Sequence, residues 1–503
     1  MSEVRSTRVP PGTYAHGMQP TVIIIGAGFG GLAAAHHLRE AGVTDITILE
    51  RSDDVGGVWR DNTYPGAACD VPSVLYSWSF APKHDWSHRY ARQDEIHRYI
   101  REHAEQSGLL ELVRTGAEVT TADWDEESRQ WTVTLADGEQ LRADVVVSAV
   151  GQLSRPSIPN IPGIDTFAGP SFHSATWDHD VDLAGKKVGV IGTGASAIQF
   201  VPEIAPQVAE LTVFQRSAPY VVPKPDSTYS TWALRRFSLL PQLHGLTRTA
   251  VFHLTEQLNK TLDDNGRLAD LLHKAWQVHL RLQVKDPALR AKLVPDYDLG
   301  CKRLLFSNNW YPALSRDNVD VVTDAITAVE PTGIRTADGV LHEVDVLIHG
   351  TGFAATEFLA PMQITGVGGR RLHDYWAEAG TQAHLGISVP KFPNFFILYG
   401  PNTNLGGSSI INMLEAQAGF ITKAVARIAE AGPIAVREDT ARAYDEEVQS
   451  RLGHSVWTSC QSWYRDASGR ISTNWPGTVA EYQKRTGRFD AADFEVVAEV
   501  AAR

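Results

Sequence analysis

Two short glycine-rich segments of this 503-residue chain have the spacing of dinucleotide-binding turns. They are Gly26-Ala27-Gly28-Phe29-Gly30-Gly31 and Gly192-Thr193-Gly194-Ala195-Ser196-Ala197, the second ending in an alanine that still opens a helix. In this pattern the first glycine makes a tight turn, the second lets the backbone approach a pyrophosphate, and the third position allows close packing of helix and strand. Two such sites in one chain indicate electron transfer between two dinucleotides.

The residue at the end of the second strand of each unit should select the nucleotide. Glu50 stands about 20 residues after Gly31, where a carboxylate can accept hydrogen bonds from both ribose hydroxyls. The second unit has Gln215, Arg216 and Ser217 there, with no acid. A 2′-phosphate carries about −1.5 to −2 charges, which Arg216 could bind with two hydrogen bonds while Ser217 donates another. We therefore predict NADPH rather than NADH; the alternative is a surface arginine at a strand end.

The elements that must position these residues repeat along the chain. Each glycine turn follows a short apolar run that is typical of a buried parallel strand, and each precedes a helix and a second strand. After each unit, an Asp-Gly pair (Asp137-Gly138 and Asp338-Gly339) predicts a hairpin, and another apolar strand follows. The expected strand, helix and strand are residues 21–25, 29–41 and 46–50, and then residues 187–191, 195–205 and 211–215.

Composition excludes several classes of protein. With 43% hydrophobic and 21% charged residues, the chain has the balance of a soluble globular protein, and a formal net charge of −13 argues against nucleic-acid binding. No apolar run reaches the roughly 18 residues that span a bilayer, and no secretory signal is visible. Cys69, Cys301 and Cys460 are far apart and odd in number, which predicts neither a disulfide framework nor a metal site. We expect a cytoplasmic protein with no metal and no obligatory protein partner.

The segment between the two glycine turns resembles the signature of the flavin-dependent Baeyer–Villiger monooxygenases. That pattern is Phe-x-Gly-x3-His-x3-Trp followed by Pro or Asp, and residues 167–178 fill every fixed position. Two of them, His173 and Trp177, are expected to couple and pack the domains rather than to act as a base. The first glycine unit, followed by Val55-Gly-Gly-Val58-Trp59, also looks like the FAD site of two-nucleotide flavoproteins.

Several site residues follow from this resemblance. The segment Tyr64-Pro-Gly-Ala, continuing to Asp70, is similar to the family's segment whose aspartate faces the flavin. Lys302 matches a lysine that reaches the cofactor phosphate, and Arg303 matches an arginine beside the flavin, which Asp70 would orient. A guanidinium stays charged, so it can stabilise a peroxide anion and the oxyanion formed next. Without the resemblance, Lys302 and Arg303 would be only a basic pair at a helix start.

Aromatic residues complete the cofactor-binding residues that the resemblance implies. Val58, Trp59 and Tyr76 are expected beside the flavin, with core packing as the alternative for the two aromatic rings, and Trp463 is expected to contact NADP.

The activity that the resemblance implies is an NADPH- and O2-dependent oxidation of a ketone to an ester or lactone, by way of a peroxyflavin. The alternative within the same class is an N- or S-oxygenating flavin monooxygenase, whose linker usually ends in Tyr or Phe where Trp177 stands. From a different class, a non-enzymatic flavoprotein or redox-sensing module is the other alternative.

The expected fold class is α/β, with two Rossmann-like dinucleotide-binding domains. After an N-terminal tail, residues 1–19, the FAD-binding domain should comprise residues 20–155 and 345–503. The NADP-binding domain should comprise residues 156–344. Within it, residues 226–296 show helical apolar periodicity, including Leu271, Trp276, Leu280 and Leu282, and we expect a helical insert that packs on the core rather than a membrane anchor.

Overall fold

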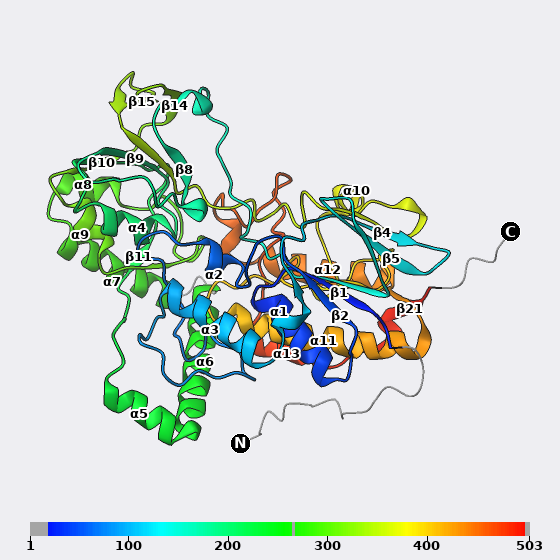
Figure 1. Cartoon of the computed structure of the whole chain (residues 1–503). Coiled ribbons are helices and arrows are strands. Elements are labelled where there is room, and N and C mark those ends of the chain that lie inside the picture. Colours follow the sequence, from blue (N-terminus) through cyan, green and yellow to red (C-terminus); the bar gives the residue numbers. More distant parts are fainter. Residues whose placement is uncertain (1–18, 264–266, 498–503) are drawn as a thin grey trace.

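The computed structural model describes residues 19–263 and 267–497, so the predicted N-terminal tail lies outside the described residues as far as residue 18. The chain forms two α/β lobes, each built on a five-stranded parallel sheet (Figure 1). The lobe with β1 carries the N-terminal glycine turn, and the lobe with β9 carries the second one. This is the predicted class of two Rossmann-like domains.

The first sheet has the strand order β19-β7-β1-β2-β3. Its central strand β1 (Val22–Ile25) is an apolar run buried on both faces, as a parallel strand between helix layers requires. Helix α1 (Phe29–Glu40) follows it directly. The other strands are β2 (Ile46–Leu49), β3 (Val113–Arg114), β7 (Val145–Ser148) and β19 (Phe395–Ile397). Because β19 pairs with β7, the chain after β17 returns to the first sheet.

The second sheet has the order β13-β10-β9-β17-β8. Its strands are β8 (Ser171–His173), β9 (Lys187–Ile191), β10 (Glu210–Phe214), β13 (Val319–Val322) and β17 (Val346–His349). Helix α4 (Ala197–Ile204) connects β9 to β10. Strand β17 pairs with both β9 and β8, so this sheet extends past residue 344, where we predicted its domain to end.

Both predicted hairpins are present. Asp137-Gly138 joins β5 to β6, and Asp338-Gly339 joins β15 to β16, each pair antiparallel. The two small sheets comprise β4 (Val119–Asp125), β5 (Gln130–Leu135), β6 (Gln140–Ala143) and β18 (Gln363–Thr365), and then β14 (Ile326–Glu330), β15 (Gly333–Thr336) and β16 (Leu341–Glu343).

The insert is helical, as predicted, and it packs through one face. It consists of α5 (Thr231–Leu239), α6 (Pro241–Asp263), α7 (Arg267–Gln283) and α8 (Pro287–Lys292). Trp276 and Leu280 are buried, whereas Leu271 and Leu282 are more than 60% exposed and do not pack on the core. From α6, Arg248 donates hydrogen bonds to the backbone oxygens of Val74 and Ser77, so the insert also contacts the first lobe.

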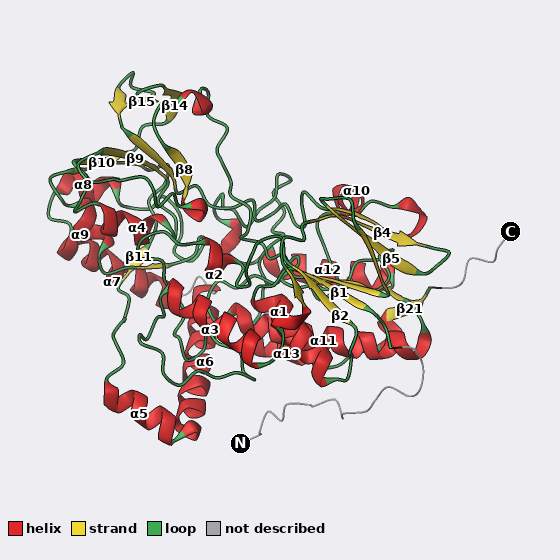
Figure 2. Cartoon of the chain, in the orientation of Figure 1, coloured by secondary structure: helices red, strands yellow, loops and turns green. Residues whose placement is uncertain are grey.

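Further helices and strands complete the two lobes (Figure 2). The helices are α2 (Val58–Asp61), α3 (Gln93–Gln106), α9 (Trp310–Leu314), α10 (Leu372–Ala379), α11 (Ile410–Ala431), α12 (Glu438–Leu452) and α13 (Val479–Thr486). The strands are β11 (Val221–Val222), β12 (Leu305–Phe306), β20 (Ile434–Val436) and β21 (Phe494–Val496). In the part of the chain that the structure describes, no helix has the length and apolarity to cross a membrane.

The prediction that the cysteines form no disulfide was wrong. Cys301 and Cys460 are bonded, with their Cα atoms 6.2 Å apart, and Cys69 is free and buried. The two partners are 159 residues apart in sequence, and the fold brings them together where a loop of the second lobe meets the C-terminal segment. Among residues 19–263 and 267–497, no group of three or more acidic, histidine or cysteine side chains has the arrangement of a metal site.

Candidate active site

The first glycine turn has the shape that a pyrophosphate needs. Gly26 has φ +105°, which favours glycine, and a Cβ atom at Gly31 would lie 1.9 Å from the Gly26 backbone oxygen. A Cβ atom at Gly28 would instead meet only the Cα atom of Gly57, at 3.8 Å. Helix α1 begins here without a side-chain cap, so its first N–H groups are free to face an anion.

Glu50 lies at the end of β2, beside this turn, and is 5% exposed. Its Oε2 accepts a hydrogen bond from the Ala27 N–H at 2.9 Å. Its Oε1 accepts hydrogen bonds from the Ser52 N–H at 3.0 Å and from Arg60 at 3.1 Å. Because a carboxylate has about four acceptor positions, about one remains. To accept both ribose hydroxyls, as we predict, Glu50 would have to exchange one of these donors for a hydroxyl.

Three residues expected on the flavin side lie together next to α1. Trp59 donates a hydrogen bond from Nε1 to the Tyr76 hydroxyl at 3.0 Å, and the two rings meet edge to face. Tyr76 in turn packs edge-on against Phe29 of α1, and burial raises its pKa well above the ordinary value, so it stays neutral. Val58 opens α2 and is 36% exposed. Trp59 and Tyr76 therefore pack on each other beside α1, whereas Val58 is exposed.

Asp70 and Arg303 form an ion pair across the two lobes. Nη2 of Arg303 donates a hydrogen bond to Oδ1 of Asp70 at 2.7 Å, and the two side chains are 31% and 24% exposed. The negative charge of Asp70 raises the pKa of Arg303 above its ordinary value, and this outweighs the desolvation that lowers it. Arg303 is thus a permanent cation held beside Asp70, and its place beside the flavin stays a prediction.

The segment that carries Asp70 is fixed by residues that sequence reasoning missed. The Tyr64 hydroxyl donates to the side-chain oxygen of Gln199 on α4 at 2.9 Å, and Nε2 of Gln199 donates to the Ala68 backbone oxygen at 2.9 Å. Nζ of Lys224 donates to the Cys69 backbone oxygen at 2.9 Å. Gln199 lies on the helix that begins at the second glycine turn, so its position in the sequence pointed to this region. Nothing in the sequence singled out Lys224.

The second glycine turn is open in the same way as the first. Gly192 has φ +110°, and a Cβ atom there would lie 2.3 Å from the Gly350 backbone oxygen. At Gly194 a Cβ atom would come no closer than 4.0 Å to that oxygen. Helix α4 begins at Ala197, and Ser196 before it makes no side-chain cap. Gly192, Gly194, Ala195, Ser196 and Ala197 thus form a second anion cradle.

Positive charge gathers at the end of β10, near this cradle. Nζ of Lys302 donates a hydrogen bond to the Ser217 hydroxyl at 3.0 Å. Desolvation lowers the pKa of Lys302, opposed by Asp296, and the nearby charge of Arg216 lowers it further. Arg216 itself is exposed. Two cations and a hydroxyl, which we predicted separately from two distant parts of the sequence, therefore meet at one place that suits a phosphate.

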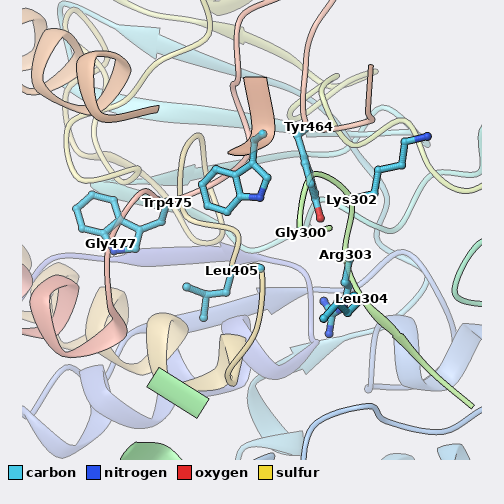
Figure 3. A pocket seen from close by; sticks show the side chains of 10 residues that line it. Gly300, Lys302, Arg303, Leu304, Leu405, Tyr464, Trp475 and Gly477 are labelled. Carbon is cyan, nitrogen blue, oxygen red and sulfur yellow. The ribbon is translucent and has the colours of Figure 1, made fainter. Parts of the chain in front are cut away.

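A cavity lies beside Arg303 (Figure 3). The loop after α8 lines one side, and the C-terminal segment after α12 lines another. Tyr464 is 1% exposed, and burial raises its pKa to about 12. Its hydroxyl contacts the backbone of Arg303. The residues around the cavity are Gly300, Lys302, Arg303, Leu304, Leu405, Gly406, Trp457, Tyr464, Trp475 and Gly477.

Trp463 does not line this cavity. Its side chain is 40% exposed, and its ring lies 4.4 Å from the ring of Tyr464. The structure therefore brings Trp463 next to the cavity wall, but it faces solvent.

His173, at the end of β8, and Trp177, just after it, have packing roles within the second lobe. His173 is 3% exposed, and its Nδ1 accepts a hydrogen bond from the Ala175 N–H at 3.0 Å. The ring of Trp177 packs on Phe172 and Phe200, with centroids 5.2 and 5.3 Å away. Neither residue lines the cavity beside Arg303.

Comparisons with known proteins agree with this geometry. The family model described as "Flavin-binding monooxygenase-like" matches residues 19–281. A "Baeyer-Villiger monooxygenase" of Streptomyces coelicolor is 43% identical over 481 residues, covering 95% of this chain and 92% of the relative. A protein of the same name from Pseudomonas aeruginosa is 41% identical over 496 residues, covering 98% and 93%.

Solved structures show the same fold. An oxidised steroid monooxygenase bound to NADP superimposes with a TM-score of 0.85 at 32% identity, covering 95% of this chain and 99% of that one. Cyclohexanone monooxygenase from Rhodococcus sp. Phi1, bound to NADP+, gives a TM-score of 0.86 at 28% identity, covering 95% and 98%. The N- or S-oxygenating alternative is not favoured by these relatives. The chain therefore belongs to the flavin-binding monooxygenases and, within them, to the NADPH-dependent Baeyer–Villiger monooxygenases, as the signature at residues 167–178 predicted.

Proposed function

We propose that this enzyme inserts one oxygen atom of O2 next to the carbonyl of a ketone that binds in the cavity beside Arg303. The observation that carries this proposal is the Arg303–Asp70 ion pair. It puts a permanent cation at a cavity wall, in a chain that has two dinucleotide cradles. Such a cation stabilises oxygen anions, which arise when a peroxide adds to a carbonyl.

The residues of the first cradle fit FAD. The space at Gly28 and the free N–H groups at the start of α1 suit a pyrophosphate, and Glu50 lies at the ribose position. We assign Gly26, Gly28, Gly31, Glu50, Val58, Trp59, Asp70 and Tyr76 to this site. When bound, FAD supplies the redox chemistry, because it accepts a hydride from NADPH and passes electrons to dioxygen.

The second cradle fits NADPH. The side chains of Arg216, Ser217 and Lys302 together offer two positive charges and a hydroxyl to a 2′-phosphate. We assign the pyrophosphate to the turn that runs from Gly192 to Ala197, and we keep Trp463 as a residue that can reach the nucleotide from the rim of the cavity.

Arg303 would act by holding positive charge at its guanidinium nitrogens, and Asp70 would act as its positioning partner. A hydrogen bond to a charged group is worth about 1.5–3 kcal/mol. Asp70 thus restricts the guanidinium to one orientation. Burial of Tyr464 and Trp475, each 1% exposed, gives this part of the cavity an apolar wall that excludes water.

We place the enzyme in the cytoplasm and assign it no obligatory protein partner. For its domains, the pairing of β17 with β9 supports an NADP-binding part of residues 156–349 rather than 156–344. The FAD-binding part would then comprise residues 20–155 and 350–503.

The proposed activity is tested with purified holoenzyme, NADPH, 18O2 and a panel of small cyclic, aromatic and long linear ketones. The expected product is an ester or lactone that carries one 18O atom. Related enzymes also oxidise sulfides, so sulfoxidation alone decides nothing. Oxidation of sulfides while every ketone is recovered unchanged would instead indicate the N- or S-oxygenating class.

A further inference from the structure

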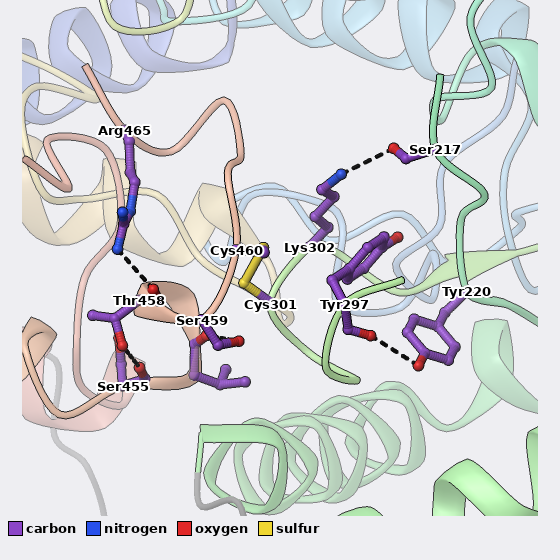
Figure 4. Close-up of a disulfide and its surroundings, with 11 residues drawn as sticks. Ser217, Tyr220, Tyr297, Cys301, Lys302, Ser455, Thr458, Ser459, Cys460 and Arg465 are labelled. Carbon is purple, nitrogen blue, oxygen red and sulfur yellow. Dashed lines mark hydrogen bonds between the residues drawn. A yellow bond between two sulfur atoms is a disulfide. The ribbon is translucent and has the colours of Figure 1, made fainter. Parts of the chain in front are cut away.

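The disulfide between Cys301 and Cys460 joins two segments that line the same cavity (Figure 4). Cys301 directly precedes Lys302 and Arg303, and Gly300 on its other side also lines the cavity. Cys460 lies between Trp457 and Tyr464, which line it from the C-terminal segment. The bond therefore connects the two walls of the proposed substrate site.

Two hydrogen bonds close to the disulfide stay within their own segment. Tyr297 accepts a hydrogen bond at its backbone oxygen from the Tyr220 hydroxyl, at 3.0 Å, within the second lobe. In the C-terminal segment, Arg465 donates to the Thr458 backbone oxygen at 2.9 Å. Across the junction, the disulfide is accompanied by the contact of the Tyr464 hydroxyl with the Arg303 backbone. Loss of the disulfide would leave each wall ordered by itself and weaken the connection between the two walls.

We propose that Cys301 and Cys460 are a reversible thiol–disulfide pair that sets how firmly the C-terminal wall, residues 456–464, is held against the loop that carries Arg303. The inference rests on the proposed function in two ways: this cavity is taken as the ketone site, and the enzyme is placed in the cytoplasm. A disulfide in a cytoplasmic enzyme is more often redox-sensing or transient than structural, which favours a reversible bond.

The chemistry balances with a peroxide as the oxidant. The thiolate of one cysteine attacks a peroxide oxygen of H2O2, the O–O bond breaks, and a sulfenic acid and hydroxide result; the hydroxide takes up the proton that the thiol lost and becomes water. The second thiol then attacks that sulfur, the S–S bond forms, and a second water leaves. Two electrons pass from the sulfurs to the peroxide. A dithiol such as dithiothreitol reverses the reaction by exchange, giving two protein thiols and a cyclic disulfide.

The two cysteines differ in accessibility. Cys301 is fully buried, and Cys460 is half-buried between two exposed neighbours, Ser459 and Gln461. Exchange depends on access of the attacking thiol to a sulfur. We therefore expect a reductant to attack at Cys460, on the more exposed side of the bond. Cys69, the third cysteine, is buried, and burial raises its pKa above the ordinary range, so it should stay an unreactive thiol.

The first part of the test counts thiols. Holoenzyme is treated with H2O2 or with dithiothreitol, then denatured and alkylated. Mass spectrometry then gives the number of alkylated cysteines. We expect one alkylated cysteine in the oxidised wild type and three after reduction, because only Cys69 is free in the structure. In the double variant Cys301→Ser/Cys460→Ser we expect one in both conditions. Three alkylated cysteines in the peroxide-treated wild type would overturn the proposal.

The second part asks whether the bond controls the cavity wall. Hydrogen exchange of residues 456–464 should speed up on reduction of the wild type and be insensitive to reductant in the double variant. The KM for a ketone should rise by at least about fivefold on reduction, the low end of typical couplings between two states. At saturating NADPH, anaerobic reduction of the flavin should be unchanged, since neither cysteine belongs to either glycine turn.

The outcomes separate this inference from the proposed function. If no ketone is converted in either state, the proposed function fails, while the thiol count and the exchange of residues 456–464 still test the redox pair. If the thiols interconvert but exchange and KM are the same in both states, the pair is reversible without controlling the cavity, and the inference is wrong. A reductant effect that persists in the double variant would contradict it as well.

Discussion

Arg303 donates a hydrogen bond to Asp70 at 2.7 Å across 233 residues of sequence, and this pair joins the loop of the second lobe to the flavin-side segment of the first. Each member alone would be a costly half-buried charge. In the pair, the guanidinium nitrogens that do not bind Asp70 can face the cavity.

Replacing Arg303 tests its assigned role most directly. In Arg303→Ala, FAD should stay bound and NADPH should still reduce it, but ester formation should fall by about 10²–10³-fold, the usual loss when an oxyanion-stabilising donor is removed. Arg303→Lys is the matched control, because it keeps the charge but loses the planar fork. Product formation and anaerobic flavin reduction are measured side by side. An unchanged ketone turnover in Arg303→Ala would falsify the role.

Replacing Asp70 should have a smaller effect than replacing Arg303. Asp70→Ala leaves the guanidinium present but no longer oriented, so kcat should fall by about 10–100-fold, which corresponds to one hydrogen bond between charged groups. Asp70→Asn keeps an acceptor oxygen, so its kcat should lie between that of Asp70→Ala and that of the wild type. Equal losses in Asp70→Ala and Asp70→Asn would show that the negative charge, and not the orientation, is what matters.

Selection of NADPH over NADH should depend on Arg216. Arg216→Ala should lower kcat/KM for NADPH by about 10–100-fold, because a charge-assisted contact with the 2′-phosphate is lost, and should leave NADH nearly unaffected. Arg98→Ala is a suitable control, since Arg98 is 59% exposed and, within the part of the chain that the structure describes, forms an ion pair with Asp94 of the same helix alone. Equal losses for both nucleotides would count against the phosphate clamp.

Lys302 should make NADPH binding sensitive to alkaline pH. Its pKa is lowered from 10.5 by desolvation and by Arg216, so the ammonium loses its proton at a lower pH than an ordinary lysine. A cation is present below its pKa, and the 2′-phosphate is fully charged above about pH 7. The KM for NADPH should therefore rise as pH increases towards this lowered pKa. In Lys302→Met the KM should be higher and flat over the same range; a parallel rise in the variant would exclude Lys302 as the titrating group.

Gly31 should be intolerant of any side chain. A Cβ atom there would lie 1.9 Å from the Gly26 backbone oxygen, so Gly31→Ala must displace the turn. Overpacking of this kind costs about 1–3 kcal/mol, which lowers Tm by several degrees, and FAD content should fall as well. Gly419→Ala is the matched control, because Gly419 lies inside α11 and a Cβ atom there has no neighbour within 4 Å. That variant should keep its FAD and gain up to about 1 kcal/mol from helix propensity. Similar losses of FAD in both variants would contradict the steric argument.

The sequence by itself determined the two glycine turns, their strands and helices, and the Asp-Gly hairpins, because these depend on local patterns of glycine, apolar runs and turn residues. It also determined the family, through the signature at residues 167–178. The tertiary structure decided which distant residues meet. Cys301 with Cys460, and Gln199 and Lys224 with the Asp70 segment, are contacts between the lobes, and sequence spacing carries no information about how two lobes pack. The exposure of Leu271 and Leu282 was likewise decided by packing, since helical periodicity shows which residues share a face but not whether another element covers it.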